Sequence, residues 1–404
     1  MLCTASPPPG LARCCLLPAA AMAALLAACA AEPAAKRPRL GELPSATTTA
    51  EPDWIPFRIR AGKAVDADPR ERRLGELRQL TFDGSSTAPA WSPDGRRLLF
   101  ESTRGEALCG QIFEMDLASG RSERVSPERG WATSGCLGGP ETGRLFFALA
   151  AGDDLRCSPI AQRVRPASIA FPQLDIYFVP RPAPGGGAGE PRPFIAAPGY
   201  DAELACAADG TLVFTSTRDG DPELYAASAQ GGEPRRLTRE PGYDGGAALS
   251  PDAARLVWHA ERRSPPAPGA AASAKGDPAT ELRLSALRIM LAGTQGQHPR
   301  AVVDDGRLNF APAFLPDGRR IGFASDRDDS PAQPERNVEL YVIDPDGPLT
   351  ATGTAAVERV TYHVGFDGAA RWSPDGQYVA FVSSRFARAA GEINLFVARW
   401  LDLE

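Results

Sequence analysis

Histidine is scarce in this sequence, with three residues among 404. So few histidines leave little material for a histidine metal site or for histidine acid–base catalysis. The sequence also has no Gly-x-Ser-x-Gly nucleophile motif and no glycine-rich phosphate loop placed between a strand and a helix. The net charge is −6, so there is no excess of positive charge to attract nucleic acid or anionic lipid. We therefore predict no catalytic residue, no metal site and no nucleic-acid partner.

Long apolar runs are also missing. Residues 16–28 form an apolar run that is too short to cross a bilayer, which needs about 20 residues. The run ends in Leu26-Ala27-Ala28-Cys29, which resembles the lipobox of bacterial lipoproteins. The resemblance implies a signal peptide over residues 1–28, a lipid on Cys29 and, because Ala30 is not aspartate, an outer-membrane location. The alternative is an ordinary secretory signal in which Cys29 has no role.

Residues 29–76 are rich in alanine, proline, threonine and charge. Such a composition is typical of a flexible tether, here between the lipid and a folded domain. One short apolar island, Trp54-Ile55-Pro56-Phe57, interrupts it and is a candidate for docking on that domain.

An internal repeat organises the rest of the chain. Trp-Ser-Pro-Asp-Gly occurs at 91–95 and again at 372–376, with weaker copies at 208–210, 249–252 and 315–318. Proline, aspartate and glycine in this order favour a tight turn. Runs of strand length, rich in aromatic and β-branched residues, flank each turn. Four such strands make one blade of a propeller, and a blade must stack on others to bury both of its faces.

Six such units can be counted, with turns near residues 95, 143, 210, 252, 318 and 376. The last unit ends after its third strand, whereas residues 77–81 (Leu-Arg-Gln-Leu-Thr) form an unassigned fourth-strand sequence before the first unit. We therefore predict an all-β fold, a six-bladed β-propeller over residues 77–404, in which an N-terminal strand closes the last blade. In blade 4 we expect the third strand to include Glu281-Leu282-Arg283.

Residues 214–225 (Phe-Thr-Ser-Thr-Arg-Asp-Gly-Asp-Pro-Glu-Leu-Tyr) and 231–238 (Gly-Gly-Glu-Pro-Arg-Arg-Leu-Thr) resemble the WD40-like repeat of the TolB propeller. The resemblance covers residues 77–404 and implies the same propeller. TolB carries an α/β domain before its propeller, and the roughly 47 residues between Cys29 and residue 77 are too few to supply one. TolB is also soluble, whereas this sequence carries the lipobox.

Four cysteines remain once the signal peptide is removed and Cys29 carries lipid. They are Cys109, Cys136, Cys157 and Cys206. An even number in an exported protein suggests two disulfides, and the sequence alone allows three pairings. Their places in the repeat predict Cys109–Cys136 and Cys157–Cys206, each linking adjacent blades. The alternative is unpaired structural thiols.

An aspartate follows an aromatic residue near the first strand of several blades. The four aspartates are Asp83, Asp201, Asp244 and Asp367. In a propeller they are expected near one mouth of the central channel, where they could attract a cation such as Ca²⁺ or a basic peptide. The alternative is that each aspartate stabilises its local turn. The repeated arginines Arg104, Arg218, Arg327 and Arg385 are expected to bond aspartates or carbonyls of the repeat.

Three functions remain open at this point. The first is a non-catalytic scaffold, lipid-anchored in the cell envelope, which binds a protein or peptide through its loops or channel mouth. The alternative is a metal-dependent propeller enzyme, such as a lactonase, lyase or hydrolase, that uses the channel carboxylates. The geometry of the four aspartates discriminates between them, because an enzyme of this kind needs their oxygens to converge on one metal ion. A third possibility is an accessory subunit that binds glycan or a surface layer.

Overall fold

The computed structural model describes residues 57–105, 109–138, 143–150, 169–170, 172–180, 189–262, 281–282, 286–329, 336–350 and 355–403. Within these ranges the chain forms strands and turns, and no helix there is long and apolar enough to cross a membrane. The predicted signal peptide, Cys29 and Cys157 lie outside the described residues.

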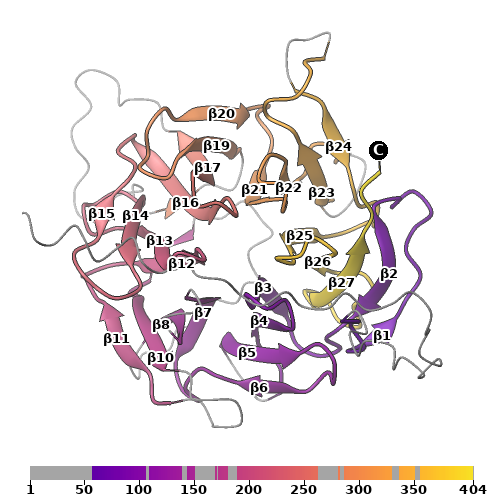
Figure 1. Ribbon diagram of the computed structural model, residues 1–404, viewed down its shortest axis with the longest axis horizontal. Helices are drawn as coiled ribbons and strands as arrows, with labels where there is room; N and C mark the ends of the chain where they lie inside the picture. The colour runs from indigo at the N-terminus through magenta and orange to yellow at the C-terminus, as the bar shows by residue number, and fades with distance from the viewer. Residues whose placement is uncertain are drawn as a thin grey trace, which may run out of the picture. The chain divides into compact units, whose positions relative to one another are not determined.

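Six small antiparallel sheets stand in a ring around a central axis (Figure 1). Blade 1 contains β3 (Ser86–Trp91), β4 (Arg97–Ser102), β5 (Gln111–Asp116) and β6 (Ser122–Arg124). Blade 2 contains β7 (Trp131–Leu137), β8 (Arg144–Ala150), β10 (Asp175–Pro180) and β11 (Arg192–Ile195). Blade 3 contains β12 (Asp201–Cys206), β13 (Thr211–Ser216), β14 (Glu223–Ser228) and β15 (Arg235–Arg236).

The other three blades complete the ring. Blade 4 contains β16 (Gly242–Leu249), β17 (Arg255–Arg262), β19 (Arg288–Gly293) and β20 (Arg300–Val303). Blade 5 contains β21 (Asn309–Phe314), β22 (Ile321–Ser325), β23 (Glu339–Ile343) and β24 (Val357–Arg359). Blade 6 contains β25 (Asp367–Trp372), β26 (Tyr378–Ser383) and β27 (Asn394–Trp400), followed in the sheet by β2 (Leu74–Gln79) and β1 (Lys63–Ala64). The predicted six-bladed β-propeller is confirmed.

The repeated turn joins the first strand of each blade to the second. In blade 1 the Ser92 hydroxyl donates to Asp94 at 2.5 Å, and the Gly95 N–H donates to the Ser92 carbonyl. Gly95 has a φ of 67°, in the left-handed region that favours glycine. We call the face of the ring that carries these turns the turn face. The opposite face, which carries the connections between second and third strands, is the loop face.

The N-terminal strand closes the ring as predicted. β2 pairs with β27, with Arg78 opposite Val397 and Gln79 opposite Phe396. The Thr81 hydroxyl accepts the N–H of Leu395 at 2.8 Å. Ser126, Thr238 and Thr361 accept the equivalent N–H in blades 1, 3 and 5, so residues 74–81 take the place of a fourth strand.

The folded domain begins earlier than the sequence predicts. β2 starts at Leu74, not at residue 77, and β1 adds a fifth strand outside it. Residues from Phe57 onward belong to the same compact unit as the propeller. Glu71, which we assigned to the tether, is buried, and its carboxylate accepts two bonds from Arg385 of blade 6. The stretch 57–76 is therefore part of the propeller.

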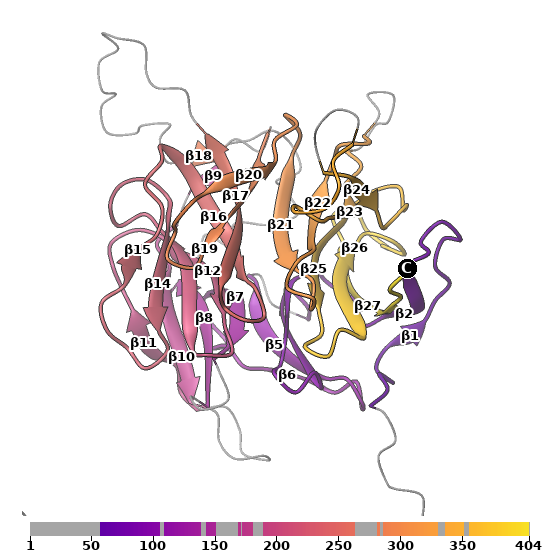
Figure 2. The same cartoon turned by 45° about the horizontal axis from the view of Figure 1, so that its top comes forward.

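The predicted third strand of blade 4 is wrong. That place is taken by β19, whereas β18 (Glu281–Leu282) pairs with β9 (Ile169–Ala170) in a separate two-stranded sheet. β9 belongs to the connection between the second and third strands of blade 2, and β18 to the equivalent connection of blade 4. Figure 2 shows the two short strands side by side. Inserted segments from two blades that are not neighbours thus meet on the loop face.

Candidate functional site

The four predicted aspartates are each bonded to an arginine of their own blade. Three of them are buried and form ion pairs: Asp201 with Arg218, Asp244 with Arg262, and Asp367 with Arg385, at N–O distances of 2.9, 2.7 and 2.7 Å. Asp83 is different, because 58% of its side chain is exposed and its contact with Arg104 is 3.2 Å long. Each carboxylate is thus engaged within its own sheet.

Asp83 also occupies a different place in its blade. Asp201 lies opposite Ser216 in the antiparallel register, as the first and second strands of blade 3 pair. In blade 1 the residue opposite the equivalent Ser102 is Ser86. Ser86, and not Asp83, is therefore the residue of blade 1 equivalent to Asp201. The sequence alignment on the preceding aromatic residue chose Asp83, three residues earlier, which shares with Asp201 only a bond to the repeated arginine of its blade.

The repeated arginines belong to the architecture of the blade. The four arginines lie over an aromatic pair from the second and third strands of their own blades, 5.0–5.8 Å from the ring centroids: Arg104, Arg218, Arg327 and Arg385. Blade 5 has Asn309 where three other blades have aspartate, and there Arg327 bonds Asp305 instead. A cation over a ring face is stabilised by the ring quadrupole, so these arginines hold each blade together.

The aspartates consequently do not converge on a common centre. In the described part of the chain, no group of three or more His, Cys, Asp or Glu side chains is placed to hold a metal ion. Each of the four aspartates instead neutralises an arginine of its own blade: Asp83, Asp201 and Asp367 pair with repeated arginines, and Asp244 pairs with Arg262.

A cavity of about 660 Å³ lies in the other half of the channel. All six first strands line it, from the middle of each strand to its turn at the turn face. None of the four predicted aspartates is among its lining residues. The candidate site is therefore at the end of the channel opposite to the one we predicted.

Two rings of equivalent positions form the wall of this cavity. Every first strand has a β-bulge at the same place, and the bulged residue has a positive φ; these bulge-ring residues are Ala88, Ser134, Glu203, Gly246, Ala311 and Ala369. Two residues closer to the turn face is a second ring, which we call the upper ring: Ala90, Cys136, Ala205, Ala248, Ala313 and Arg371.

Only two of these twelve positions carry a charge. The others are alanine, glycine, serine or cysteine, whereas Glu203 stands in the bulge ring and Arg371 in the upper ring. A residue that the repeat requires should recur from blade to blade, as the arginines over the aromatic pairs do. Because Glu203 and Arg371 each occur once, the construction of the propeller does not account for them.

Glu203 is held by four donors. Its two carboxylate oxygens accept from the hydroxyls of Tyr200 at 3.2 Å, Thr215 at 2.7 Å and Tyr243 at 2.7 Å, and from the N–H of Gly246 at 2.8 Å. Burial, and then the charge of Glu203, raise the pKa of Tyr243 well above its usual range, so its hydroxyl keeps its proton. The Glu203 charge is thus stabilised within the wall.

His259 reaches the cavity from a second strand because Gly246 has no side chain. A Cβ on Gly246 would lie 2.1 Å from Cε1 of His259. Burial lowers the pKa of His259 to about 4, so the imidazole is neutral at neutral pH. Its Nε2 lies 3.3 Å from the Tyr243 hydroxyl, and its buried Nδ1 has no hydrogen-bond partner among the described residues.

Among the described residues, Arg371 is the only arginine or lysine that lines the cavity. Its Nη1 donates to the carbonyls of Ala370 at 2.9 Å and Ala311 at 3.4 Å. Over the residues that the structure describes, no carboxylate forms an ion pair with it. Burial lowers the pKa of Arg371 to about 10, which leaves it positively charged at neutral pH.

Two tryptophans stand in the cavity wall between the upper ring and the turns. Trp91 donates its Nε1 hydrogen to the carbonyl of Arg371 at 2.8 Å. Trp372 packs edge-on against Trp400 at 5.3 Å, and its buried Nε1 has no partner among the described residues. Both line the cavity, so the mouth around Arg371 is largely aromatic and apolar.

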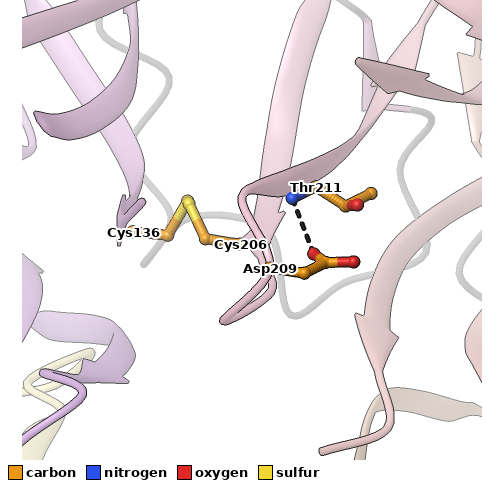
Figure 3. The surroundings of a disulfide bond; sticks show 4 residues. All are labelled: Cys136, Cys206, Asp209 and Thr211. Atoms are coloured by element: carbon orange, nitrogen blue, oxygen red, sulfur yellow. Dashed lines mark hydrogen bonds between the residues drawn. A yellow bond between two sulfur atoms is a disulfide. The ribbon is translucent and has the colours of Figure 1, made fainter. Parts of the chain in front are cut away.

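The disulfide in this wall differs from our prediction. Cys136 of blade 2 is bonded to Cys206 of blade 3, with their Cα atoms 5.8 Å apart (Figure 3). The predicted Cys109–Cys136 and Cys157–Cys206 pairs are therefore wrong. Cys136 lies at the turn-face end of its strand, next to the same end of β12, whereas Cys109 precedes β5 on the loop face. Cys109 is itself disulfide-bonded.

Sequence reasoning missed Glu203, His259 and Arg371. Matching turns and aromatic residues selects what the repeat conserves, and these residues depart from it. An alignment of the six first strands from each turn backwards would have shown one arginine among small residues. The same alignment would not have found His259. Its side chain comes from the second strand of blade 4 and reaches the cavity through the space that a side chain on Gly246 would fill.

Several solved structures are similar to this chain at low identity. No protein-family model matches the sequence, and no curated protein matches it. A structure from Agrobacterium tumefaciens, described as TolB, covers 79% of this chain and 91% of its own at 19% identity and a TM-score of 0.49. TolB from Acinetobacter baumannii is 15% identical with a TM-score of 0.48, and the match spans 70% of this chain and 56% of that one. A gluconolactonase from Xanthomonas campestris, 15% identical, covers 84% of this chain and 98% of its own with a TM-score of 0.49. The chain is a six-bladed β-propeller similar in fold to the TolB structures.

Proposed function

We propose that the protein is a non-catalytic binding propeller of the bacterial cell envelope, whose channel cavity receives a segment of an envelope protein or peptide. The observation that carries this proposal is the cavity itself. Its volume of about 660 Å³ is within the range of ligand sites, roughly 300–1,000 Å³. Its wall is mostly apolar, with few polar groups, and this is the usual composition of a binding pocket.

The metal-dependent alternative receives no support from the carboxylates on which it depends. Asp201, Asp244 and Asp367 bond arginines in three separate blades, and Asp83 is exposed. A Ca²⁺ ion takes six to eight oxygen ligands around one centre, which aspartates bonded in this way do not provide.

The proposed location is the periplasmic side of the outer membrane, through a lipid on Cys29. The lipobox sequence supports the anchor, and the Cys136–Cys206 disulfide is consistent with an oxidising compartment outside the cytoplasm.

The anchor can be tested by acylation. In cells fed an alkynyl fatty acid, we expect the full-length protein to become labelled and Cys29→Ala to lose the label completely. Cys14→Ala, which removes a cysteine from the signal segment, is the matched control and should be labelled like the parent. Equal labelling of the Cys29 variant would show that the anchor lies elsewhere or does not exist.

The cavity can be tested by filling it. Ala205 belongs to the upper ring and is partly exposed to the cavity. Hexapeptides selected on the immobilised protein should bind Ala205→Trp at least about tenfold more weakly, since the indole occupies the space that the peptide needs. Calorimetry with synthetic copies of the selected peptides gives the dissociation constants.

Ala118→Trp is the control, because Ala118 is exposed in the turn after β5, away from the cavity. In cells, cross-linking should attach the same envelope protein to the parent and to Ala118→Trp, but not to Ala205→Trp. Undiminished peptide binding and cross-linking by Ala205→Trp would rule out the cavity as the binding site.

A further inference from the structure

Resting on the proposed function, we infer that Arg371 binds the terminal carboxylate of a peptide chain that enters the cavity end-on from the turn face. The basis is a positive charge in the cavity wall with no counter-charge in the described protein, placed among apolar side chains. The inference names the chemical group that the ligand must carry.

The free edge of the guanidinium has the shape that a carboxylate fits. Both hydrogen bonds of Arg371 to protein carbonyls use Nη1. The Nε and Nη2 hydrogens therefore remain without protein acceptors among the described residues. Two parallel N–H groups can bond both oxygens of one carboxylate, a geometry that adds energy and selectivity.

The single cation of the cavity wall matches one anionic group on the ligand. Among the described residues, Arg371 is the only arginine or lysine of the lining and Glu203 the only acidic residue, and the lowered pKa of His259 keeps the imidazole neutral. A dianionic phosphate would meet a single cation together with the charge of Glu203. Because Glu203 already accepts four hydrogen bonds in the wall, it does not need a cation from the ligand.

The surroundings favour a peptide over a sugar acid. Apart from the charged residues and His259, the side chains beside Arg371 are mainly alanine, proline and tryptophan, which offer few partners to the hydroxyls of a sugar. Buried hydroxyls without partners lose affinity. Trp91 and Trp372 add partly buried apolar surface to the wall near Arg371, which suits the apolar side chains of a peptide.

The depth of Arg371 favours a chain end over a side-chain carboxylate. Arg371 lies one residue before the end of β25, and the turn that contains Pro374 continues the wall beyond the strand. The backbone of Arg371 is therefore below the turn-face end of the wall, by up to about 10 Å. A terminus reaches this level as a single extended chain, whereas an internal carboxylate requires the peptide to enter and turn back within the same space.

The test compares free-acid and amidated peptides on the full-length protein. Two libraries of N-acetylated hexapeptides are used as probes, identical except that one ends in a free carboxylate and the other in an amide. Peptides selected from the free-acid library should bind about tenfold or more tightly than their own amides. Arg371→Gln should remove this preference, and Arg371→Lys should keep part of it as a single point charge.

Arg121→Gln is the matched control, since it removes the same charge from a side chain that is 78% exposed on the outer edge of blade 1. It should leave the acid–amide preference unchanged. Arg371→Ala introduces the residue found at four other upper-ring positions, so it provides a second variant expected to fold, with thermal melting as the check.

The outcomes separate this inference from the proposed function. If acids and amides bind equally and Ala205→Trp blocks both, the carboxylate inference fails while the proposed function stands. If no peptide from either library binds, the proposed function fails with it. Binding of galacturonate or inorganic phosphate that depends on Arg371, without binding of free-acid peptides, would overturn the inference in favour of another anion.

Discussion

Replacing Arg385 with methionine should lower the free energy of unfolding by about 3–5 kcal/mol. The guanidinium lies between two buried carboxylates, with N–O distances of 2.9 Å to Glu71 and 2.7 Å to Asp367. Its side chain is 6% exposed, and both acids are at 0%. Without the cation, two buried negative charges would face each other with no counter-charge, which is the costly way to break a buried ion pair.

Urea unfolding at pH 7 measures this loss, and Arg104→Met is the matched control. Arg104 is the equivalent residue of blade 1 and also lies over an aromatic pair, but its carboxylate partner Asp83 is 58% exposed, so Arg104→Met leaves no buried charge unpaired and its loss should be clearly smaller than that of Arg385→Met. Equal losses in the two variants would contradict this account.

Glu71 shows why the start of the folded domain could not be predicted from composition. The stretch 57–76 lacks the repeated turn and is rich in charge, which is the composition of a tether. Its charges have fixed partners: Glu71 bonds Arg385, and Arg73 bonds Glu358 at 2.8 Å. Composition does not distinguish a charge that water solvates from one that pairs with a residue about 300 positions later in the chain.

The blade number and the closing strand were predictable for a physical reason. Each blade uses the same short-range chemistry, a Ser-Pro-Asp-Gly type turn and a Thr or Ser hydroxyl that binds the third strand. A ring with no free sheet edge inside it then requires the missing strand to come from elsewhere in the chain. Thr81 satisfies that requirement with the same bond that Thr238 makes in blade 3.

The disulfide pairing and the residues of the candidate site could not be predicted because both depend on where along a strand each residue lies. Cys136 and Cys206 are neighbours because both lie at turn-face ends, and the β-bulge sets which side chains point into the channel. A bulge changes the count of residues along a strand, so alternation of side chains alone does not locate Arg371 in the wall. Asp83 is offset from Ser86 for a different reason, because the aromatic residue used for the alignment does not lie at a fixed distance before the first strand.

Closure itself can be tested at Leu77, for which Leu77→Ala should cost about 2–5 kcal/mol. Leu77 is 2% exposed and belongs to a core cluster that joins blade 6 to Val338 and Leu340 of blade 5. The substitution leaves a void at the strand that holds the first and last parts of the propeller together. Denaturant unfolding measures the loss, and Glu76→Ala is the control on the same strand.

Glu76 has a side chain 61% exposed and a 3.6 Å contact with Arg399, so its removal should cost less than about 1 kcal/mol. Hydrogen exchange adds a readout specific to closure. If β2 locks the ring, Leu77→Ala should speed exchange first at the amides of β2 and β27, because blade 6 then opens before the rest of the propeller. A uniform rise in exchange over all six blades would show that Leu77 contributes only general core packing and that the ring does not open at this strand.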